Sequence, residues 1–286
     1  MGTQYHTAIS NADFTSLAEI KSLQNRQWEY QWEYVCHHSQ FYRRYFGHIA
    51  PTIPLAGLSD LPLTDKEMLR KDQISNPSFG SYLATDESNV IRMHRTSGTT
   101  GTAMNLALTA KDARITAEVG ARAQRASGLG PHNKVVHCLN YQMWMGGYTD
   151  HSTLEATGAM VIPFGVGSTK KLIETIQSLK IDAISCTPSY PAALSQAIDA
   201  DFPQLDPRDL GLKLALFGGK AGLDDPAFRR RLEDTWGFTA RNANYGVTDV
   251  MCNFAGQSTL DNDLHFVALD VLYPELIDPD LGTPIP

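Results

Sequence analysis

A run of glycine and hydroxyl residues has the composition best suited to chemistry in this sequence. It consists of Thr96, Ser97, Gly98, Thr99, Thr100 and Gly101. The two glycines free the backbone to curl, so that successive N–H groups can point at one anion. The hydroxyls of the run, with that of Thr102, add donors that can follow a phosphate as it moves. The run therefore predicts a phosphate-binding loop.

The same composition is also typical of a solvated linker. Two strand-like segments flank the run, Ile91–His94 and Met104–Thr109, and they favour the loop because a simple hairpin would need far fewer residues between them. The run is not a Walker A loop, since no Gly-Lys-Ser/Thr follows at the required spacing. A Rossmann turn is also excluded, because its nearest candidate, Gly165–Gly167, lacks the third glycine.

A second cluster, Asn244–Asp249, directly follows the strand-like residues 239–243. Its residue types suit the binding of a nucleotide. Tyr245 could stack on a base, Thr248 could form a hydrogen bond to a phosphate, and Asp249 could hold Mg²⁺ through its carboxylate oxygens. Tyr-Gly turns are common, however, so this cluster alone is also compatible with an ordinary turn.

The elements that must position these residues alternate between strand and helix. Apolar runs predict strands, and residues three or four apart on one face predict helices. Asp225 and Pro226 are predicted to start a helix that Gly237 ends, while Thr64 and Ser189 are predicted to cap two others. The predicted strands are 134–139, 159–163, 181–186 and 214–217, and the helices include 171–180. This alternation predicts an α/β fold with a largely parallel sheet.

The two ends of the chain differ from this pattern. Aromatic and apolar side chains in residues 14–47 have helical spacing; such a stripe could bind a flat ligand, but helix packing is the favoured interpretation. The last stretch, 264–286, resembles two strands that run into a Pro/Gly turn. Because a turn normally leads to another strand, we expect the chain to be a fragment of a longer protein.

The composition excludes several classes of protein. Of 286 residues, 42% are hydrophobic and 19% charged, which is an ordinary globular balance. Lys plus Arg number 24 against 31 Asp plus Glu, a net charge of −7, so we expect no nucleic-acid partner. The four scattered cysteines predict neither a zinc site nor a disulfide framework. Without a leader or a long apolar run, we expect a cytoplasmic protein with no membrane partner.

Together, the run at 96–101 and the cluster at 244–249 resemble the signature pair of the adenylate-forming superfamily of acyl-CoA synthetases and peptide-synthetase adenylation domains. Further segments narrow the resemblance to the phenylacetate–CoA ligase-like branch and cover nearly the whole chain in order. They are Leu63–Lys66 with Leu69 and Arg70, Arg92–His94, Gly146–Gly147, Val161–Pro163, Thr187–Tyr190, Phe217–Gly219 and Tyr273–Pro279.

The resemblance implies layered sheets with flanking helices, as in the N-terminal domain of adenylate-forming acyl-CoA synthetases. It implies a helical N-terminal subdomain over 1–85 and an adenylation core over 86–286.

The resemblance also implies roles for individual residues. The loop would hold the β- and γ-phosphates of ATP, Thr248 would contact the α-phosphate, and Asp249 would coordinate Mg²⁺. The residues implied at the adenine are Gly218, Gly219, Lys220, Asn244, Tyr245 and Gly246. Those implied at the acyl substrate are Tyr141, Trp144, Gly147, His151, Pro188 and Tyr190. A purely structural role stays equally open for His151, and core packing stays open for Tyr141 and Trp144.

Several positions depart from the pattern of that branch. Thr102 and Ala103 stand where relatives usually have Lys and Pro, Lys220 replaces an acidic residue, and Asp249 replaces Glu. Residues 256–259 lack the cysteine that some relatives use for zinc, so we expect no zinc. The ribose-binding Asp, the hinge and the domain with the catalytic Lys would all lie beyond Pro286.

The resemblance implies a two-step reaction with ATP, Mg²⁺ and coenzyme A. A carboxylic acid would be activated to acyl-AMP with release of pyrophosphate, and CoA would then displace AMP. Because the acyl region is rich in Tyr, Trp and Met, we expect an aromatic acid of the phenylacetate, benzoate or anthranilate type. Two alternatives stay open: a truncated or inactive core that only binds an aryl acid or acyl-AMP, and an adenylation enzyme that loads a carrier protein. A homodimer is compatible with the resemblance.

Overall fold

The computed structural model describes residues 16–47, 52–96, 103–283 and 285. The chain divides into two compact units, which are described one at a time: unit 1 is Met1–Lys111 with Ala268–Pro286, and unit 2 is Asp112–Val267. The subdomain boundary after residue 85, which the resemblance implies, stays a prediction.

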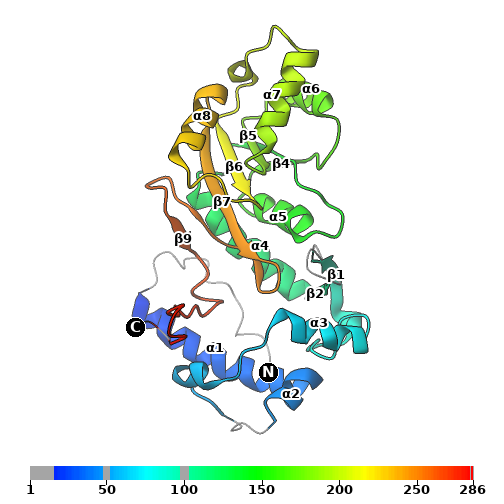
Figure 1. The fold of residues 1–286 in the computed structure, drawn as a ribbon, viewed down its shortest axis with the longest axis vertical. Helices are drawn as coiled ribbons and strands as arrows, with labels where there is room; N and C mark the ends of the chain where they lie inside the picture. Colours follow the sequence, from blue (N-terminus) through cyan, green and yellow to red (C-terminus); the bar gives the residue numbers. More distant parts are fainter. Residues whose placement is uncertain (1–15, 48–51, 97–102, 284, 286) are drawn as a thin grey trace. The chain divides into compact units, whose positions relative to one another are not determined.

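Unit 1 begins with helices. They are α1 (Leu17–His38), α2 (Gln40–Tyr45), η2 (Leu55–Asp60), α3 (Lys66–Ser75) and η3 (Glu87–Asn89) (Figure 1). Ser16 and Glu19 form a reciprocal capping box at the start of α1. The prediction of Thr64 as the cap of α3 is wrong by one residue: the cap is Asp65, because its carboxylate accepts a hydrogen bond from the Met68 N–H at 2.8 Å.

The aromatic side chains of α1 and α2 pack on one another. The ring of Trp32 lies 5.8 Å from that of Trp28 and 5.1 Å from that of Phe46, which in turn stacks on Tyr42 at 5.6 Å. The Trp28 indole N–H donates to the Ile53 carbonyl at 2.7 Å. Helix packing, the favoured interpretation of this stripe, is confirmed for these residues.

Unit 1 also holds an antiparallel strand pair, β1 (Val90–Arg95) and β2 (Asn105–Thr109). Arg95 pairs with Asn105 at the end where the strands are joined. The strands predicted on either side of the hydroxyl-rich run are therefore confirmed, although residues 97–102 themselves lie outside the described residues.

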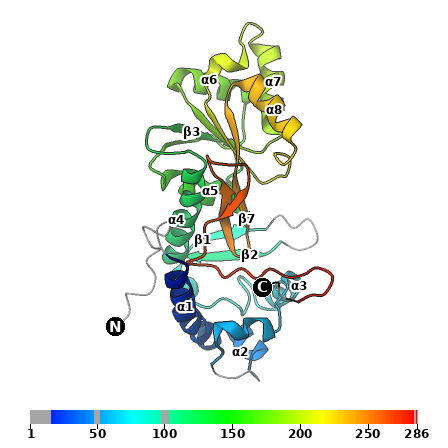
Figure 2. The ribbon, with the colours of Figure 1, turned by 90° about the vertical axis from the view of Figure 1, so that its left-hand side faces the viewer.

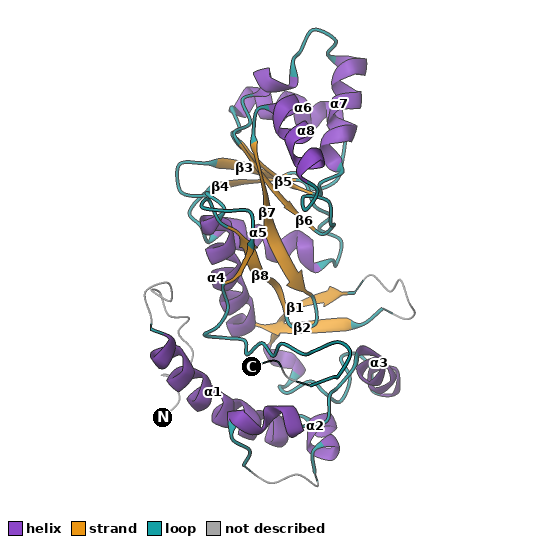
Figure 3. Cartoon of the chain, turned by 60° about the vertical axis from the view of Figure 1, so that its left-hand side comes forward, coloured by secondary structure: helices purple, strands orange, loops and turns teal. Residues whose placement is uncertain are grey.

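Unit 2 is built on a seven-stranded sheet of order β4-β3-β5-β6-β7-β8-β9, drawn in orange in Figure 3. The first five strands are parallel, and β8 and β9 add antiparallel pairs. The strands are β3 (Lys134–His137), β4 (Met160–Pro163), β5 (Ala183–Cys186), β6 (Leu214–Gly218), β7 (Thr239–Val247), β8 (Met251–Gln257) and β9 (Leu264–Phe266). The predicted α/β fold with a largely parallel sheet is confirmed.

Helices cover both faces of this sheet. They are α4 (Ala110–Ala126), α5 (Met145–Glu155), α6 (Thr169–Leu179), α7 (Tyr190–Asp201), η4 (Pro207–Leu210) and α8 (Pro226–Trp236). One core cluster joins α6, α7 and α8 to the strands, and Phe217 and Trp236 are its largest members. The other cluster contains Leu154 of α5. Helix α4 packs on α5 (Figure 2), where a Cβ on Gly120 would come within 2.3 Å of Thr153.

The local signals of the sequence have mixed outcomes in unit 2. Asp225 caps α8 through a bond from the Ala227 N–H, and Gly237 ends α8 with a φ of 74°, as predicted. Ser189 is the N-cap residue of α7, as predicted, but its side chain accepts no capping bond. The second of the two strands predicted in 264–286 is also absent from the described residues of that stretch, which hold only β9.

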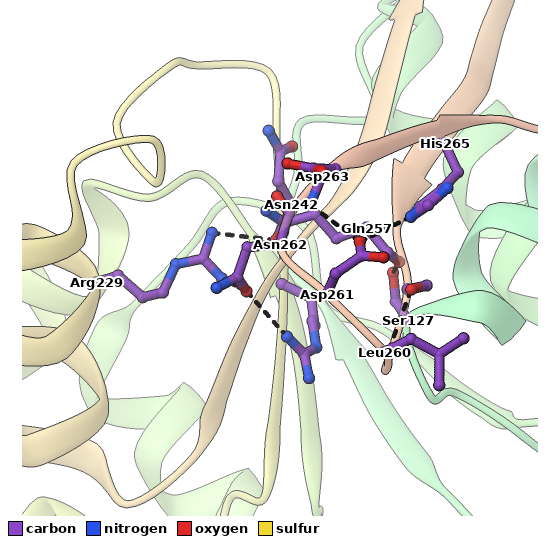
Figure 4. A network of polar contacts seen from close by, with 11 residues as sticks. Ser127, Arg229, Asn242, Gln257, Leu260, Asp261, Asn262, Asp263 and His265 are labelled. Carbon is purple, nitrogen blue, oxygen red and sulfur yellow. Dashed lines mark hydrogen bonds and ion pairs between the residues drawn. The ribbon is translucent and has the colours of Figure 1, made fainter.

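A buried arginine ties the antiparallel end of the sheet to α8 (Figure 4). The guanidinium of Arg229 donates to the Ala240 carbonyl at 3.0 Å, to Asn262 Oδ1 at 2.9 Å and to Gln257 Oε1 at 3.2 Å. Ser127 of the loop after α4 donates to the Gln257 carbonyl at 2.8 Å. Burial lowers the pKa of Arg229, but an arginine with lowered pKa is still protonated at neutral pH. The network therefore holds a cation on neutral oxygens and fixes the turn at 258–263.

No helix within the described residues is long and apolar enough to span a bilayer.

Candidate functional site

The base of the predicted phosphate loop is closed by hydrogen bonds in unit 1. The Thr96 N–H donates to the Met104 carbonyl at 2.9 Å, and the Met104 N–H donates to Thr96 Oγ1 at 3.0 Å. Both residues are buried. Thr96 therefore has its hydroxyl engaged as an acceptor for the backbone. The other predicted phosphate residues, Ser97, Gly98, Thr99, Thr100 and Gly101, lie outside the described residues.

The remaining predicted residues lie in unit 2, at the carboxyl edge of its parallel strands. Tyr141 and Trp144 follow β3, Pro188 and Tyr190 follow β5, and Gly218 ends β6. In open α/β sheets, ligands bind outside this edge. The fold thus gathers the predicted adenine and acid residues at the edge where a ligand is expected.

Two glycines at the end of β6 bring the predicted adenine and acid residues into contact. A Cβ on Gly218 would lie 2.7 Å from Asn244 Cβ, so the Asn244 side chain covers this glycine. Gly219 has a φ of 74°, and its Cβ would lie 3.3 Å from the Trp144 ring. The same ring would meet a Cβ on Gly146 at 2.7 Å. Trp144 therefore fills the space between the start of α5 and the Gly218–Gly219 turn.

The cluster at 244–249 was expected to follow the strand 239–243, but its first four residues belong to that strand, β7 (Thr239–Val247). Tyr245 pairs with Ala255 and Val247 with Met251, so β7 continues to Val247 because β8 pairs with it. The turn begins at Thr248, which is half-buried, and Asp249 is exposed. Tyr245 is 52% exposed and touches Phe254 edge-on at 5.8 Å, which leaves part of its ring accessible to a base.

Two of the predicted acid residues, Tyr141 and His151, are connected to each other and to Glu155 of α5 through polar contacts. Tyr141 Oη lies 2.9 Å from His151 Nδ1, and His151 Nε2 lies 3.1 Å from Glu155. Since a carboxylate only accepts, the neutral ring donates from Nε2 and accepts the Tyr141 hydroxyl at Nδ1. Burial, with Cys138 and Glu155 nearby, raises the pKa of Tyr141. The hydroxyl is therefore neutral and held in one direction.

The sequence reasoning missed His137, the last residue of β3. Its Nε2 lies 3.0 Å from the Gly147 carbonyl and its Nδ1 lies 3.1 Å from Ser185 Oγ. Burial lowers the pKa of His137 to about 4. The hydrogen bond to the Gly147 carbonyl acts to raise this pKa, and the nearby His151 acts to lower it further. A polar residue inside the predicted buried strand 134–139 is the signal that could have found it.

Asp150 of α5 is a second residue that the sequence reasoning missed. It is 2% exposed, and its carboxylate accepts a hydrogen bond from the side-chain amide of Asn244. The two residues are 94 positions apart, so only the fold reveals the contact. It links α5, which carries the predicted acid residues Gly147 and His151, to the strand that carries Tyr245.

His137 should make the protein less stable in mild acid. We expect the protonation of His137 in the unfolded chain to lower the free energy of unfolding by about 2 kcal/mol when the pH falls from 8 to 5. Its pKa is about 4 when folded and about 6.5 when unfolded, so the unfolded chain binds more protons in this window. The loss begins near the unfolded pKa and levels off below the folded one.

Urea unfolding at both pH values measures this loss. The variant His137→Gln cannot titrate and should lack that part of the pH dependence. An equal dependence in both proteins would contradict the prediction.

A cavity of about 480 Å³ lies elsewhere, in unit 1, between the end of α1 and the segment 76–89. Its lining includes Tyr34, His38, Asp86 and Glu87, and it includes none of the predicted site residues. The cavity is therefore separate from the residues that the sequence indicates.

The fold is that of the adenylate-forming CoA ligases. The chain superposes on 2-hydroxyisobutyryl-CoA ligase in complex with 2-HIB-AMP and CoA with a TM-score of 0.84, at 26% identity over 96% of this chain and 58% of that chain. An open conformation of the same enzyme gives a TM-score of 0.83 at 25% identity, over 93% of this chain and 58% of that one.

Within that class, the chain is similar to phenylacetate-coenzyme A ligases. It is 33% identical to the enzyme of Pseudomonas putida over 81% of this chain, and 29% identical to that of Escherichia coli (strain K12) over 98%. The resemblance inferred from the sequence is thus confirmed. The chain spans 51% and 63% of the length of these two relatives. No family profile matches the chain.

Proposed function

We propose that this chain binds ATP and an aromatic carboxylic acid and forms acyl-AMP with release of pyrophosphate, from which CoA displaces AMP in the complete protein. The observation that carries the proposal is the contact of Trp144 with Gly219, which joins the predicted acid and adenine residues at one sheet edge. Similarity to phenylacetate-coenzyme A ligases supports the same reaction.

The residues at this edge suit a reaction between two anions. The acid is already ionised at neutral pH, so its attack on the α-phosphorus needs no general base. What the reaction needs is positioning and neutralisation of charge. Thr248 would donate its hydroxyl to the α-phosphate, and the run at 96–101 keeps the role with the outer phosphates that the resemblance implies.

Magnesium fits the donor set at the end of β7. Asp249 offers exposed carboxylate oxygens, which are the ligands that this ion prefers. Across the part of the chain that the structure describes, no three His, Cys, Asp or Glu side chains gather into a metal cluster. The ion would be held by the Asp249 carboxylate together with nucleotide phosphates and water. When bound, Mg²⁺ would neutralise phosphate charge.

An aromatic acid fits the predicted acid residues better than a charged or strongly polar one. Tyr141 and Trp144, which are both partly exposed, would offer ring surfaces to a planar substrate, whereas Tyr190 packs against the core cluster of α6, α7 and α8. Burial, with Cys138 nearby, raises the pKa of Tyr190 to about 12, so its hydroxyl stays neutral beside a carboxylate. The aromatic ring of the acid would therefore pack on rings without meeting a negative charge.

Isothermal titration of the chain with a non-hydrolysable aryl-AMP analogue, phenylacetyl sulfamoyl adenosine, tests the proposal. We expect binding at least 10-fold tighter than that of AMP, since the analogue engages both sets of residues. A decanoyl analogue serves as the control and should bind more weakly. Equal binding of AMP and both analogues would contradict the proposal.

Acid-dependent exchange of labelled pyrophosphate into ATP separates an active core from one that only binds. Supplying CoA, or a carrier protein in its place, then identifies the acceptor. Exchange with phenylacetate and none with decanoate is the expected result.

A further inference from the structure

His137 occupies a central place among the predicted acid residues. We propose that it is a positioning residue for the acid site, which acts by holding the carbonyl of Gly147 from inside the protein. This inference rests on the proposed function, because it assigns a role within the same site.

The direction of each hydrogen bond at His137 follows from the chemistry of its partners. A carbonyl oxygen only accepts, so Nε2 must carry the proton and donate to Gly147 across 3.0 Å. In the neutral ring, Nδ1 then has a lone pair and accepts the hydroxyl of Ser185 across 3.1 Å. The acceptor-only carbonyl of Gly147 therefore selects the tautomer, and the hydroxyl of Ser185 satisfies the other ring nitrogen.

The backbone at Gly147 lies against the loop that follows β3. A Cβ on Gly147 would come within 2.2 Å of the Asn140 carbonyl oxygen and 2.7 Å of Tyr141 Cα. Any displacement of Gly147 toward that loop must therefore move the backbone of Asn140 and Tyr141. The bond from His137 fixes the first turn of α5 and, through this close contact, the position of the Tyr141 ring.

Ring contacts extend the influence of His137 to both members of the Tyr141–His151 pair. The His137 ring meets the Tyr141 ring edge-on, with centroids 5.5 Å apart, and lies 6.3 Å from the ring of His151. In an α-helix, the carbonyl of residue 147 is also the partner of the N–H of residue 151. His137 thus contacts Gly147, Tyr141 and His151 from the buried side of the site.

Burial makes these bonds hard to replace. His137 is fully buried and Ser185 and Gly147 are buried around it, so water cannot readily take over a lost partner. Without His137, the Gly147 carbonyl would keep only its helical partner, and its second lone pair would stay unsatisfied in a buried place, which costs free energy. The three residues come from β3, α5 and β5, and these elements or the loops after them carry every predicted acid residue except Tyr190, which is the first residue of α7.

A histidine that only fills space in the core would show the same burial, so the test must separate the two hydrogen bonds. The amide nitrogen of glutamine reaches about as far as Nε2, and the shorter amide of asparagine reaches about as far as Nδ1. His137→Gln can therefore keep the donor to Gly147, whereas His137→Asn loses it. Both variants remove the ring and its packing, which makes them a matched pair.

The readout is the dissociation constant of phenylacetyl sulfamoyl adenosine compared with that of AMP, by titration of the whole chain. We expect His137→Asn to weaken the analogue at least 10-fold and AMP by less than twofold. His137→Gln should bind the analogue within threefold of the wild type. Equal weakening by both variants, or equal weakening of AMP and the analogue, would overturn the positioning role.

A third variant keeps the test decisive if the histidine variants do not fold. Ser185→Ala leaves the ring in place but removes the hydroxyl that holds its Nδ1, and should weaken the analogue about threefold with AMP unchanged. An unchanged analogue affinity, or an equal loss for AMP, would overturn the inference. A different outcome would refute the proposed function, and this inference with it. In that outcome, the wild-type chain binds AMP and binds the analogue no more tightly than AMP.

Discussion

Replacing Asp249 by asparagine should lower acid-dependent exchange of pyrophosphate into ATP by about 100-fold. The change keeps the size of the side chain and removes its charge. If Asp249 is the one protein carboxylate on Mg²⁺, the neutral amide leaves the ion held by phosphates and water alone. Exchange at saturating ATP and acid, measured over a range of Mg²⁺ concentrations, gives the effect.

The position of Asp249 explains why the loss should appear in activity and not in stability. The side chain is exposed, in the turn between β7 and β8, and surface substitutions usually change the free energy of unfolding by less than about 0.5 kcal/mol. Urea unfolding should therefore give nearly the same midpoint for Asp249→Asn and the wild type.

A carboxylate elsewhere on the surface provides the matched control. Asp263 is exposed in the turn between β8 and β9, and Asp263→Asn changes the net charge by the same amount. We expect its exchange rate to stay within twofold of the wild type. Near-normal exchange in Asp249→Asn, or an equal loss in both variants, would rule out the metal role.

The regular elements could be predicted from the sequence because short-range physics determines them. The predicted strand 134–139 is found as β3, Lys134–His137, since residues 135–137 are buried between helices on both faces of the sheet. Asp225, Pro226 and Gly237 mark the ends of α8 since capping uses only neighbouring backbone groups. The sequence signals and the fold agree wherever the partners of a residue lie within a turn or two of it.

The rest depends on partners that are distant in the chain. Tyr245 lies inside β7 because Ala255 pairs with it across the hairpin, and no local signal specifies that pairing. The contact of Asp150 with Asn244 is formed by helix packing on the sheet. The buried Arg229 was hidden in the same way, because its acceptors come from β7, β8 and the turn after β8. The motifs thus indicated the chemistry, while the supporting residues emerged only from the fold.

Replacing Gly147 by alanine should weaken the affinity for the acyl-AMP analogue at least 100-fold. A methyl group at this position would lie 2.2 Å from the Asn140 carbonyl oxygen and 2.7 Å from Tyr141 Cα. Carbon atoms make favourable contact only at about 3.5–4.0 Å. Because these neighbours are backbone atoms, they cannot rotate away as a side chain would, and the loop at 140–144 must move.

Helix propensity alone predicts the opposite effect on stability, namely that alanine at position 147 stabilises the protein. Gly147 lies in the first turn of α5, and alanine is more favourable than glycine inside a helix by about 1 kcal/mol. Overpacking in a close-packed interior typically costs about 1–3 kcal/mol, and a backbone clash this severe belongs at the upper end. We therefore expect a net loss of about 2 kcal/mol in the free energy of unfolding, measured in urea.

Gly130→Ala separates the clash from a general effect of removing a glycine. Gly130 also lies in unit 2, and no atom would come within 4 Å of its Cβ. This variant should keep its affinity for the analogue and change the free energy of unfolding by less than about 0.5 kcal/mol. If Gly147→Ala instead stabilised the protein and retained the affinity, the first turn of α5 could not be pressed against the loop after β3, and the positioning role of His137 would lose its physical basis.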